Sequence, residues 1–173
     1  MIKDDDIEKF FKSINVDIMD IVAVAVLCVM KTESSSQITF DEFKRGCDYL
    51  KVDSFEKWPN AIKGLRKKLQ DDDSFFREVY EFSFIINQDT GFKNIGTETA
   101  VALWDLFLKD KCLFYKDWIT FIVDKKKPAV IKLDQWNMFY ELIKQTKGNI
   151  KNFVDDGTWS SIIDEFIEYI QNK

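Results

Sequence analysis

The side chains that most often carry catalysis are absent from this sequence or stand without a catalytic partner. None of the 173 residues is histidine, so no serine or cysteine has the usual general base beside it. No G-x-S-x-G, Walker or G-x-G-x-x-G pattern occurs. Aspartate runs stand at 71–73 and 155–156, but such runs usually solvate helix starts. The composition therefore favours binding over catalysis, with a carboxylate-based hydrolase as a less favoured alternative.

One segment has the rhythm of an EF-hand, the helix–loop–helix motif that binds calcium. With Ile38 at loop position 8, Lys31 stands at position 1, Ser36 at position 6 and Glu42 at position 12. Calcium requires oxygen ligands from the first position onward and a glycine for the sharp turn at the sixth. We therefore predict an EF-hand-like helix pair without metal, which opens a hydrophobic groove suited to an amphipathic or apolar ligand.

The cysteines also suggest no metal or disulfide. Cys28, Cys47 and Cys112 form no C-x-x-C pair, and three is an odd number. Each stands among apolar residues, which predicts a small buried hydrophobic side chain. We expect no cofactor and no metal ion.

Charge and hydropathy restrict the possible partners. The formal net charge is −5, which gives no electrostatic reason to bind nucleic acid or anionic lipid. Residues 152–172 carry five acids and no lysine or arginine, so this segment can attract a basic partner. The apolar run at 21–30 is shorter than the roughly 18 to 20 residues of a membrane helix, and the N-terminus lacks an apolar signal core. We expect a cytoplasmic or nuclear protein without nucleic-acid or membrane partners.

The hydrophobic spacing is helical almost throughout, which predicts an all-α fold. Alternation within the run at 21–30 is also compatible with a strand, but its length favours a helix. A turn-rich segment at 87–96 predicts a boundary between an N-terminal lobe, about 1–88, and a C-terminal lobe, about 95–173. The expected helices cover residues 7–14, 17–31, 40–50, 58–69, 74–87, 98–109, 115–123, 134–145 and 159–170.

Several helix starts are predicted from polar residues that can accept a backbone hydrogen bond. Thr39 and Glu42 have the spacing of a capping box, in which each side chain accepts from the backbone of the other. Asp17 and Thr97 stand where N-caps of the following helices are expected.

Three blocks near the C-terminus carry a resemblance to a known family. They read KLDQWN at 132–137, NFVDDGTW at 152–159 and IIDEFIEY at 162–169. Both the blocks and their spacing resemble the potentiating-neddylation domain of the defective-in-cullin-neddylation family, with the patterns K-D-x-W-N, N-Y-D-E-x-G-A-W-P and L-I-D-E-F-V-E. Upstream, AVALWDLFL at 100–108 and ITFDEF at 38–43 resemble further family segments in the same order.

The resemblance implies a fold and a function. The whole chain, 1–173, would form one potentiating-neddylation domain of two EF-hand-like helical lobes packed as one compact domain without calcium sites. Family members are scaffold-type ligase components without catalytic residues of their own. They promote transfer of a ubiquitin-like modifier from its conjugating enzyme to a cullin. An EF-hand-like adaptor that binds an unrelated peptide or helix is the alternative function. We expect a monomer.

Residue by residue, the family's cullin-binding patch of Asp, Ala and Asp falls on Asp134, Thr158 and Asp164. The patch would hold the cullin's C-terminal winged-helix subdomain, its two acids contacting lysine or arginine side chains. Thr158 departs from the family's alanine. Asp134 and Thr158 also suit helix N-caps, whereas Asp164 is expected within a helix on the polar face, where it has no capping role. Trp136 and Trp159 lie on apolar faces and are expected in the core.

A second implied site is a hydrophobic pocket for the N-acetylated terminal methionine of the conjugating enzyme. Acetylation removes the terminal charge, so the methionine can be buried without the cost of an unpaired ion. Every candidate for this pocket also suits an ordinary core position at helical spacing. The candidates are Phe43, Cys47, Leu50, Ile86, Leu103 and Leu106.

Overall fold

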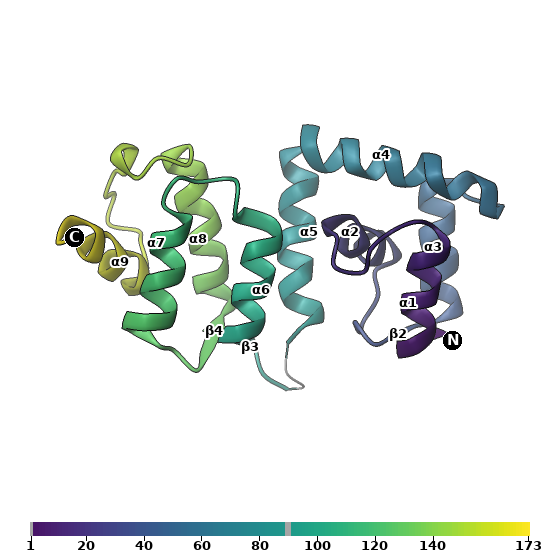
Figure 1. Ribbon diagram of the computed structural model, residues 1–173, viewed down its shortest axis with the longest axis horizontal. Coiled ribbons are helices and arrows are strands. Elements are labelled where there is room, and N and C mark those ends of the chain that lie inside the picture. The colour runs from purple at the N-terminus through teal and green to yellow at the C-terminus, as the bar shows by residue number, and fades with distance from the viewer. Residues whose placement is uncertain (1, 89–90) are drawn as a thin grey trace. The chain divides into compact units, whose positions relative to one another are not determined.

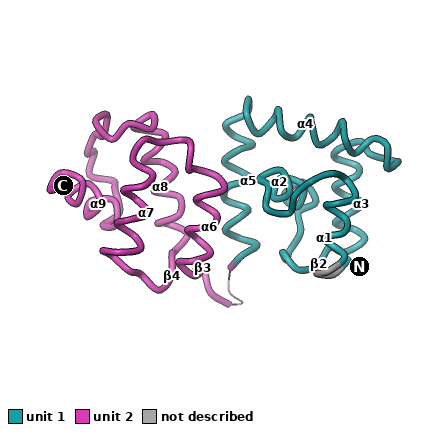
Figure 2. The backbone as a smooth tube through the Cα atoms, viewed as in Figure 1, with its two compact units in different colours: residues 1–87 teal, residues 88–173 magenta. Residues whose placement is uncertain are grey.

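The computed structural model describes residues 2–88 and 91–173, and the chain is helical almost throughout (Figure 1). The prediction of an all-α fold is confirmed, since the strands of the described residues are two or three residues long. The chain divides into two compact units, residues 1–87 and residues 88–173 (Figure 2). Residues 89–90 of the turn-rich segment lie outside the described residues.

The first unit combines α-helices with one short antiparallel strand pair. Its helices are α1 (Asp4–Ser13), α2 (Ile21–Met30), α3 (Phe40–Leu50), α4 (Trp58–Asp71) and α5 (Asp73–Ile86), and a 3₁₀ turn at Phe55–Lys57 leads into α4. Its strands are β1 (Ile2–Lys3) and β2 (Gln37–Ile38), with Ile2 opposite Ile38.

Helix α2 is the centre of the first unit, and the helix interpretation of the apolar run is confirmed. Its residues from Val22 to Met30 are all buried, and it lies against α3, α4 and α5. A helix that is apolar on every face must be covered on every face. The chain therefore folds around α2, leaving the amphipathic helices to present their polar faces to solvent.

The prediction of Asp17 as the N-cap of α2 is wrong, because Asp20 holds that position. The Asp20 carboxylate accepts the backbone N–H of Val22 at 2.9 Å and two hydrogen bonds from Arg66 of α4, at 3.1 and 2.7 Å. Asp17 instead accepts the N–H of Met19 within the preceding turn. Asp20 thus both starts α2 and ties it to α4.

Glu42 occupies the place of a calcium-ligating acid, yet it binds its own loop. The side chain is 7 % exposed, and its carboxylate accepts the backbone N–H groups of Glu33 and Thr39 at 2.9 and 2.6 Å. The Thr39 hydroxyl also donates to it at 2.8 Å, and the predicted capping box is confirmed. Hydrogen-bond donors of its own loop therefore stabilise the charged carboxylate.

The second unit repeats the helix–loop–helix plan. Its helices are α6 (Thr97–Leu108), α7 (Tyr115–Thr120), which continues as a π-helical stretch at Phe121–Lys126, α8 (Leu133–Thr146) and α9 (Ser161–Gln171), with a 3₁₀ turn at Ile150–Asn152. Its strands are β3 (Asn94–Gly96) and β4 (Val130–Lys132). The start of α6 differs from the prediction, because Gly96 is the N-cap and the Thr97 hydroxyl donates to the Pro128 carbonyl.

The β3–β4 pair joins the loops that precede α6 and α8. The strands are antiparallel, and Ile95 and Ile131 face each other and are fully buried. Each isoleucine precedes a helix start, as Ile38 does in the first unit. Gln135 stands four residues after Ile131, the same spacing as Glu42 after Ile38. The Gln135 side-chain oxygen accepts the N–H of Lys132 at 3.0 Å.

An aromatic core fills the second unit. Trp104, Trp118 and Trp136 are fully buried. The Trp118 ring stacks on Phe139 of α8 at 4.1 Å between ring centres and meets Phe166 of α9 edge-on at 5.1 Å. These contacts fix α7, α8 and α9 against one another.

The Glu42 geometry predicts a pH-dependent contribution to stability. Burial alone would raise the pKa of this carboxyl, but hydrogen bonds from Thr39 and Glu33 and the charge of Arg45 outweigh burial and lower the pKa. We expect Glu42→Gln to reduce the free energy of unfolding by about 1–3 kcal/mol at neutral pH, because an amide cannot accept these bonds equally well.

Since the folded pKa of Glu42 is lowered, its contribution is complete above the unfolded pKa, about 4.3. It is lost as pH falls through the folded pKa, so wild type and variant converge in acid. Urea titrations at several pH values measure this difference. Glu33→Gln, with the same charge change in the same loop, is the control. A constant difference from neutral pH to acid would contradict the assignment.

Candidate protein interface

Asp134 is the second residue of α8, and its side chain is exposed. The alternative interpretation, that it caps α8, does not apply, because the N-cap is Lys132. Its carboxylate makes no hydrogen bond or ion pair with another described residue. The positive end of the helix dipole favours an acid in this first turn. The side chain is therefore exposed, and no hydrogen bond or ion pair within the described residues engages its carboxylate.

Asp164 is also in a first turn, whereas the sequence predicted a place further along the final helix. Helix α9 begins at Ser161 with Ser160 as its N-cap, and Asp164 is exposed. Its backbone N–H donates to the Ser160 carbonyl at 3.2 Å, while its carboxylate has no partner among the described residues. Asp134 and Asp164 are thus free acids in the first turns of two helices.

Thr158 lies in the loop before α9, and the alternative interpretation as an N-cap does not apply to it either, because Ser160 is the N-cap. Its hydroxyl donates to the Asp156 carboxylate at 2.6 Å, and its backbone N–H donates to the same oxygen at 3.0 Å. These two hydrogen bonds lower the pKa of the Asp156 carboxyl. The hydroxyl that distinguishes Thr158 from alanine is therefore held by its own loop.

The two tryptophans of this region differ in burial. Trp136 is fully buried, as predicted, but Trp159 is half-buried and precedes α9. The Trp159 ring lies 5.6 Å from that of Phe153, and its ring N–H donates to the Val154 carbonyl at 3.2 Å. Trp159 therefore holds the loop that carries Thr158.

Helices α8 and α9 pack against each other, so the two acids belong to one packed pair of helices. The Lys126 ammonium contacts both carboxylate oxygens of Glu165 at 2.6 Å, which ties α9 to the π-helical stretch after α7. Sequence spacing contains no signal for this pair, because its partners are 39 residues apart in the chain. The structure records no hydrogen bond that joins Asp134, Thr158 and Asp164 to one another in the described residues.

The methionine-pocket candidates are all half-buried and come from three helices. Phe43, Cys47 and Leu50 share one face of α3, with the Phe43 ring 5.6 Å from that of Phe10. Ile86 ends α5, also in the first unit. Leu103 and Leu106 are on α6 in the second unit. Each unit thus contributes apolar side chains that its own core covers only in part.

The cysteines match the prediction only in part. Cys28 is buried, whereas Cys47 and Cys112 are half-buried. Burial raises the pKa of the Cys28 and Cys112 thiols to about 12, and it raises that of Cys47 as well. At neutral pH these thiols are protonated and behave as apolar side chains.

The described residues contain no cluster of three or more acids or cysteines that could hold a metal ion. Within the same residues, no helix has both the length and the apolar character needed to cross a membrane.

An all-α chain with EF-hand-like helix pairs and free acids on two packed helices has the features of a protein-binding module. The family model described as cullin binding matches residues 57–169, more than half of the chain. The chain therefore belongs to the cullin-binding family.

Curated relatives agree with this assignment. "Defective in cullin neddylation protein 1" of Caenorhabditis elegans is 23% identical over 82% of this chain and 54% of its own length. "DCN1-like protein 3" of Xenopus laevis is 27% identical over 97% of this chain and 56% of its own. "DCN1-like protein 5" of Homo sapiens is 26% identical over 94% and 68%. The chain thus spans little more than half the length of the first two relatives.

The Thr158 contacts predict a measurable change at Asp156. Thr158→Ala removes the hydroxyl donor and keeps the backbone N–H, so the pKa of Asp156 should rise toward its usual range without reaching it. NMR titration of the side-chain carboxyl carbons measures this shift. Asp53, whose pKa Lys57 lowers elsewhere in the chain, is the internal control and should not change. An unchanged Asp156 titration would show that the hydroxyl does not contribute.

Proposed function

We propose that the chain is a non-catalytic scaffold that promotes cullin neddylation by binding a cullin and the neddylation conjugating enzyme. The match to the cullin-binding family carries the proposal. The relatives' names, which refer to cullin neddylation, support it. The proposal assigns the second unit to the cullin's C-terminal winged-helix subdomain and a hydrophobic pocket to the N-acetylated terminus of the conjugating enzyme.

The free carboxylates of Asp134 and Asp164 support the cullin assignment. An acid that its own fold does not neutralise can form a charge-assisted hydrogen bond with a lysine or arginine of a partner. Both acids are exposed, so a partner can reach them without a rearrangement of the fold. The long acidic segment at 152–172 adds an attractive field for a basic surface.

Thr158 departs from the family pattern without removing the patch. Its hydroxyl donates to Asp156 within the loop and so does not enter the interface as an unpaired polar group. What Thr158 adds toward a partner is the bulk of its side chain.

Each candidate for the methionine pocket is an apolar side chain that its own unit leaves half-buried, which supports the proposal of an apolar site. An acetylated terminus has no ammonium charge, so burial of the methionine against these side chains gains hydrophobic free energy without an ionic cost. A free terminus would have to bring its charge into this apolar site. The pocket would therefore distinguish an acetylated terminus from a free one, because only the free terminus carries a charge.

The mechanism that follows is proximity. The conjugating enzyme carries the modifier as a thioester. Simultaneous binding of this enzyme and a cullin raises the effective concentration of the cullin's acceptor lysine near the thioester. The chemistry belongs to the conjugating enzyme. The scaffold needs docking surfaces and no proton shuttle, which agrees with a chain that has no histidine.

Charge reversal tests the acidic patch. We expect Asp164→Lys to weaken binding of a cullin C-terminal fragment by at least about tenfold, because it repels the basic partner group and removes its acceptor. Isothermal titration measures the affinity, and circular dichroism checks the fold. Glu168→Lys, an exposed acid on the same helix, is the matched control and should have a small effect. Equal losses in both variants would contradict a specific role for Asp164.

The acetyl group tests the pocket. A peptide with the conjugating enzyme's N-terminal sequence should bind at least about tenfold more tightly with an acetylated than with a free terminus. Leu106→Gln should weaken the acetylated peptide, whereas Leu113→Gln, at an exposed leucine of the same unit, should not. Equal affinity for both peptides, or none for either, would favour an adaptor with an unrelated ligand.

A further inference from the structure

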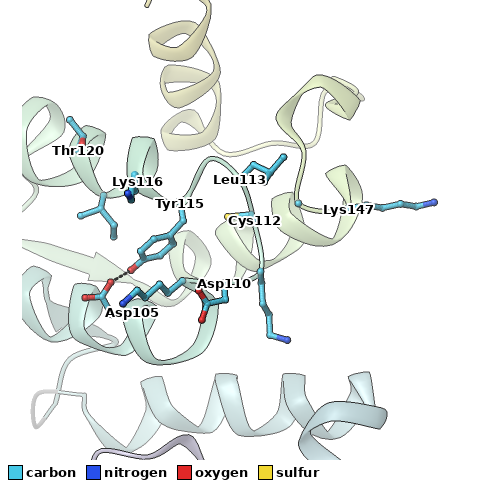
Figure 3. Close-up of a pocket in the computed structure, with 12 residues that line it drawn as sticks. Asp105, Asp110, Cys112, Leu113, Tyr115, Lys116, Thr120 and Lys147 are labelled. Carbon is cyan, nitrogen blue, oxygen red and sulfur yellow. Dashed lines mark hydrogen bonds between the residues drawn. The ribbon is translucent and has the colours of Figure 1, made fainter.

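A hollow of about 1000 Å³ lies in the second unit, outside every residue assigned to the cullin patch or the methionine pocket. Its lining comes from the end of α6, the segment that leads into α7, the first turns of α7 and the turn after α8. Figure 3 shows these side chains around the hollow. Ten of the twelve lining residues lie within residues 105–120, and Lys147 and Gly148 join them from the turn after α8.

Close backbone packing fixes one wall of the hollow. The N–H of Leu113 donates to the Gly148 carbonyl at 2.8 Å, which joins the two turns. Gly148 has a φ of +75°, and a Cβ at this position would lie 2.6 Å from the Lys111 carbonyl oxygen. Only glycine permits this approach. The two turns therefore form a defined wall.

A hydrogen bond fixes the opposite side. The Tyr115 hydroxyl donates to the Asp105 carboxylate at 2.5 Å, which links α7 to α6 (Figure 3). Burial, the hydrogen bond to Asp105 and the negative charge of this carboxylate all raise the pKa of Tyr115, so the hydroxyl stays protonated and remains a donor. One of the lining acids is therefore already engaged within the protein.

The charge of the lining is opposite to that of the chain. Four lysines and two aspartates line the hollow, whereas the whole chain carries a net charge of −5. Lys109, Lys116 and Lys147 are exposed and form no ion pair with another described residue. Because the lysines outnumber the aspartates, the formal charge of the lining is positive. A positive site in an acidic protein is complementary to an anionic ligand.

The lining also offers an apolar surface. Leu113 is 84 % exposed, more than any other large hydrophobic side chain in the described chain. The half-buried Ile119 and the protonated Cys112 thiol belong to the same lining. A small inorganic anion would leave this surface in water, whereas a peptide with an apolar side chain would cover it.

We propose that the hollow binds an acidic peptide segment of a partner protein. Carboxylates of the segment pair with Lys109, Lys116 and Lys147, and an apolar side chain between them covers Leu113 and Ile119. The hollow shares no residue with the proposed cullin and methionine sites. Failure of this proposal would therefore leave the proposed function unaffected, and the reverse also holds.

A fluorescent peptide of sequence Glu-Asp-Leu-Glu-Asp, blocked at both ends, is the probe, and fluorescence polarisation with the full chain is the measurement. We expect binding that weakens when salt is raised to about 0.5 M, because screening reduces the attraction. Lys116→Glu and Lys147→Glu should each lower the affinity by roughly fivefold. Lys125→Glu, which makes the same charge change outside the hollow, should change it less than about twofold.

Two further probes test the nature of the ligand. Replacing the peptide's acids by amides should abolish binding, and replacing its leucine by serine should weaken binding. Absence of binding, an equal effect of Lys125→Glu and Lys116→Glu, or equal binding of the amide peptide would overturn the proposal. Displacement by equimolar inorganic phosphate would also overturn it, because the site would then be a simple anion site.

Discussion

The aromatic contacts among α7, α8 and α9 are the interaction on which the candidate interface depends. Trp118 touches both Phe139 of α8 and Phe166 of α9, so one side chain holds the helices that carry Asp134 and Asp164. Each such aromatic pair contributes about 0.5–1.5 kcal/mol beyond its buried area. Ionic contacts such as Lys126 with Glu165 lie at the surface and orient α9 more than they stabilise it. Buried rings therefore do the positioning, and exposed acids remain free for a partner.

The EF-hand-like loops are held by hydrogen bonds between protein groups, whereas a calcium ion holds the loop of an EF-hand. In the first unit, Glu42 turns back to the backbone of its own loop, and in the second unit Gln135 makes a related contact before α8. The short strand pairs then align the loops through buried isoleucines. The geometry of these loops is thus a property of the fold and does not wait for an ion. This agrees with the proposed docking function, in which the surfaces are present before a partner arrives.

The acids and thiols of this chain fit the proposed binding function. Its acids stand in first turns, where helix dipoles favour them, and its thiols are protonated because burial raises their pKa. None of these groups is paired with a base. The second unit instead presents surfaces of opposite charge, with free acids on α8 and α9 and lysines around the hollow between α6 and α7. A scaffold that joins several proteins requires such separate and chemically distinct surfaces.

Much of the fold was determined by the sequence itself. Period and propensity are local properties, so the apolar run of α2, the Thr39–Glu42 capping box and the order of the helices followed from spacing alone. The family blocks selected Asp134 and Asp164 as candidate binding residues, and that selection stays a prediction. Helix starts were less certain. Asp17, Thr97 and Thr158 are all good caps by type, but Asp20, Gly96 and Ser160 hold those positions. Only the tertiary structure decided these cases, because a cap depends on where packing lets the helix begin. The tertiary structure alone also determined the half-exposure of Trp159, the Lys126–Glu165 pair and the hollow around Tyr115, because each depends on how helices and loops pack, which the local spacing of residue types does not show.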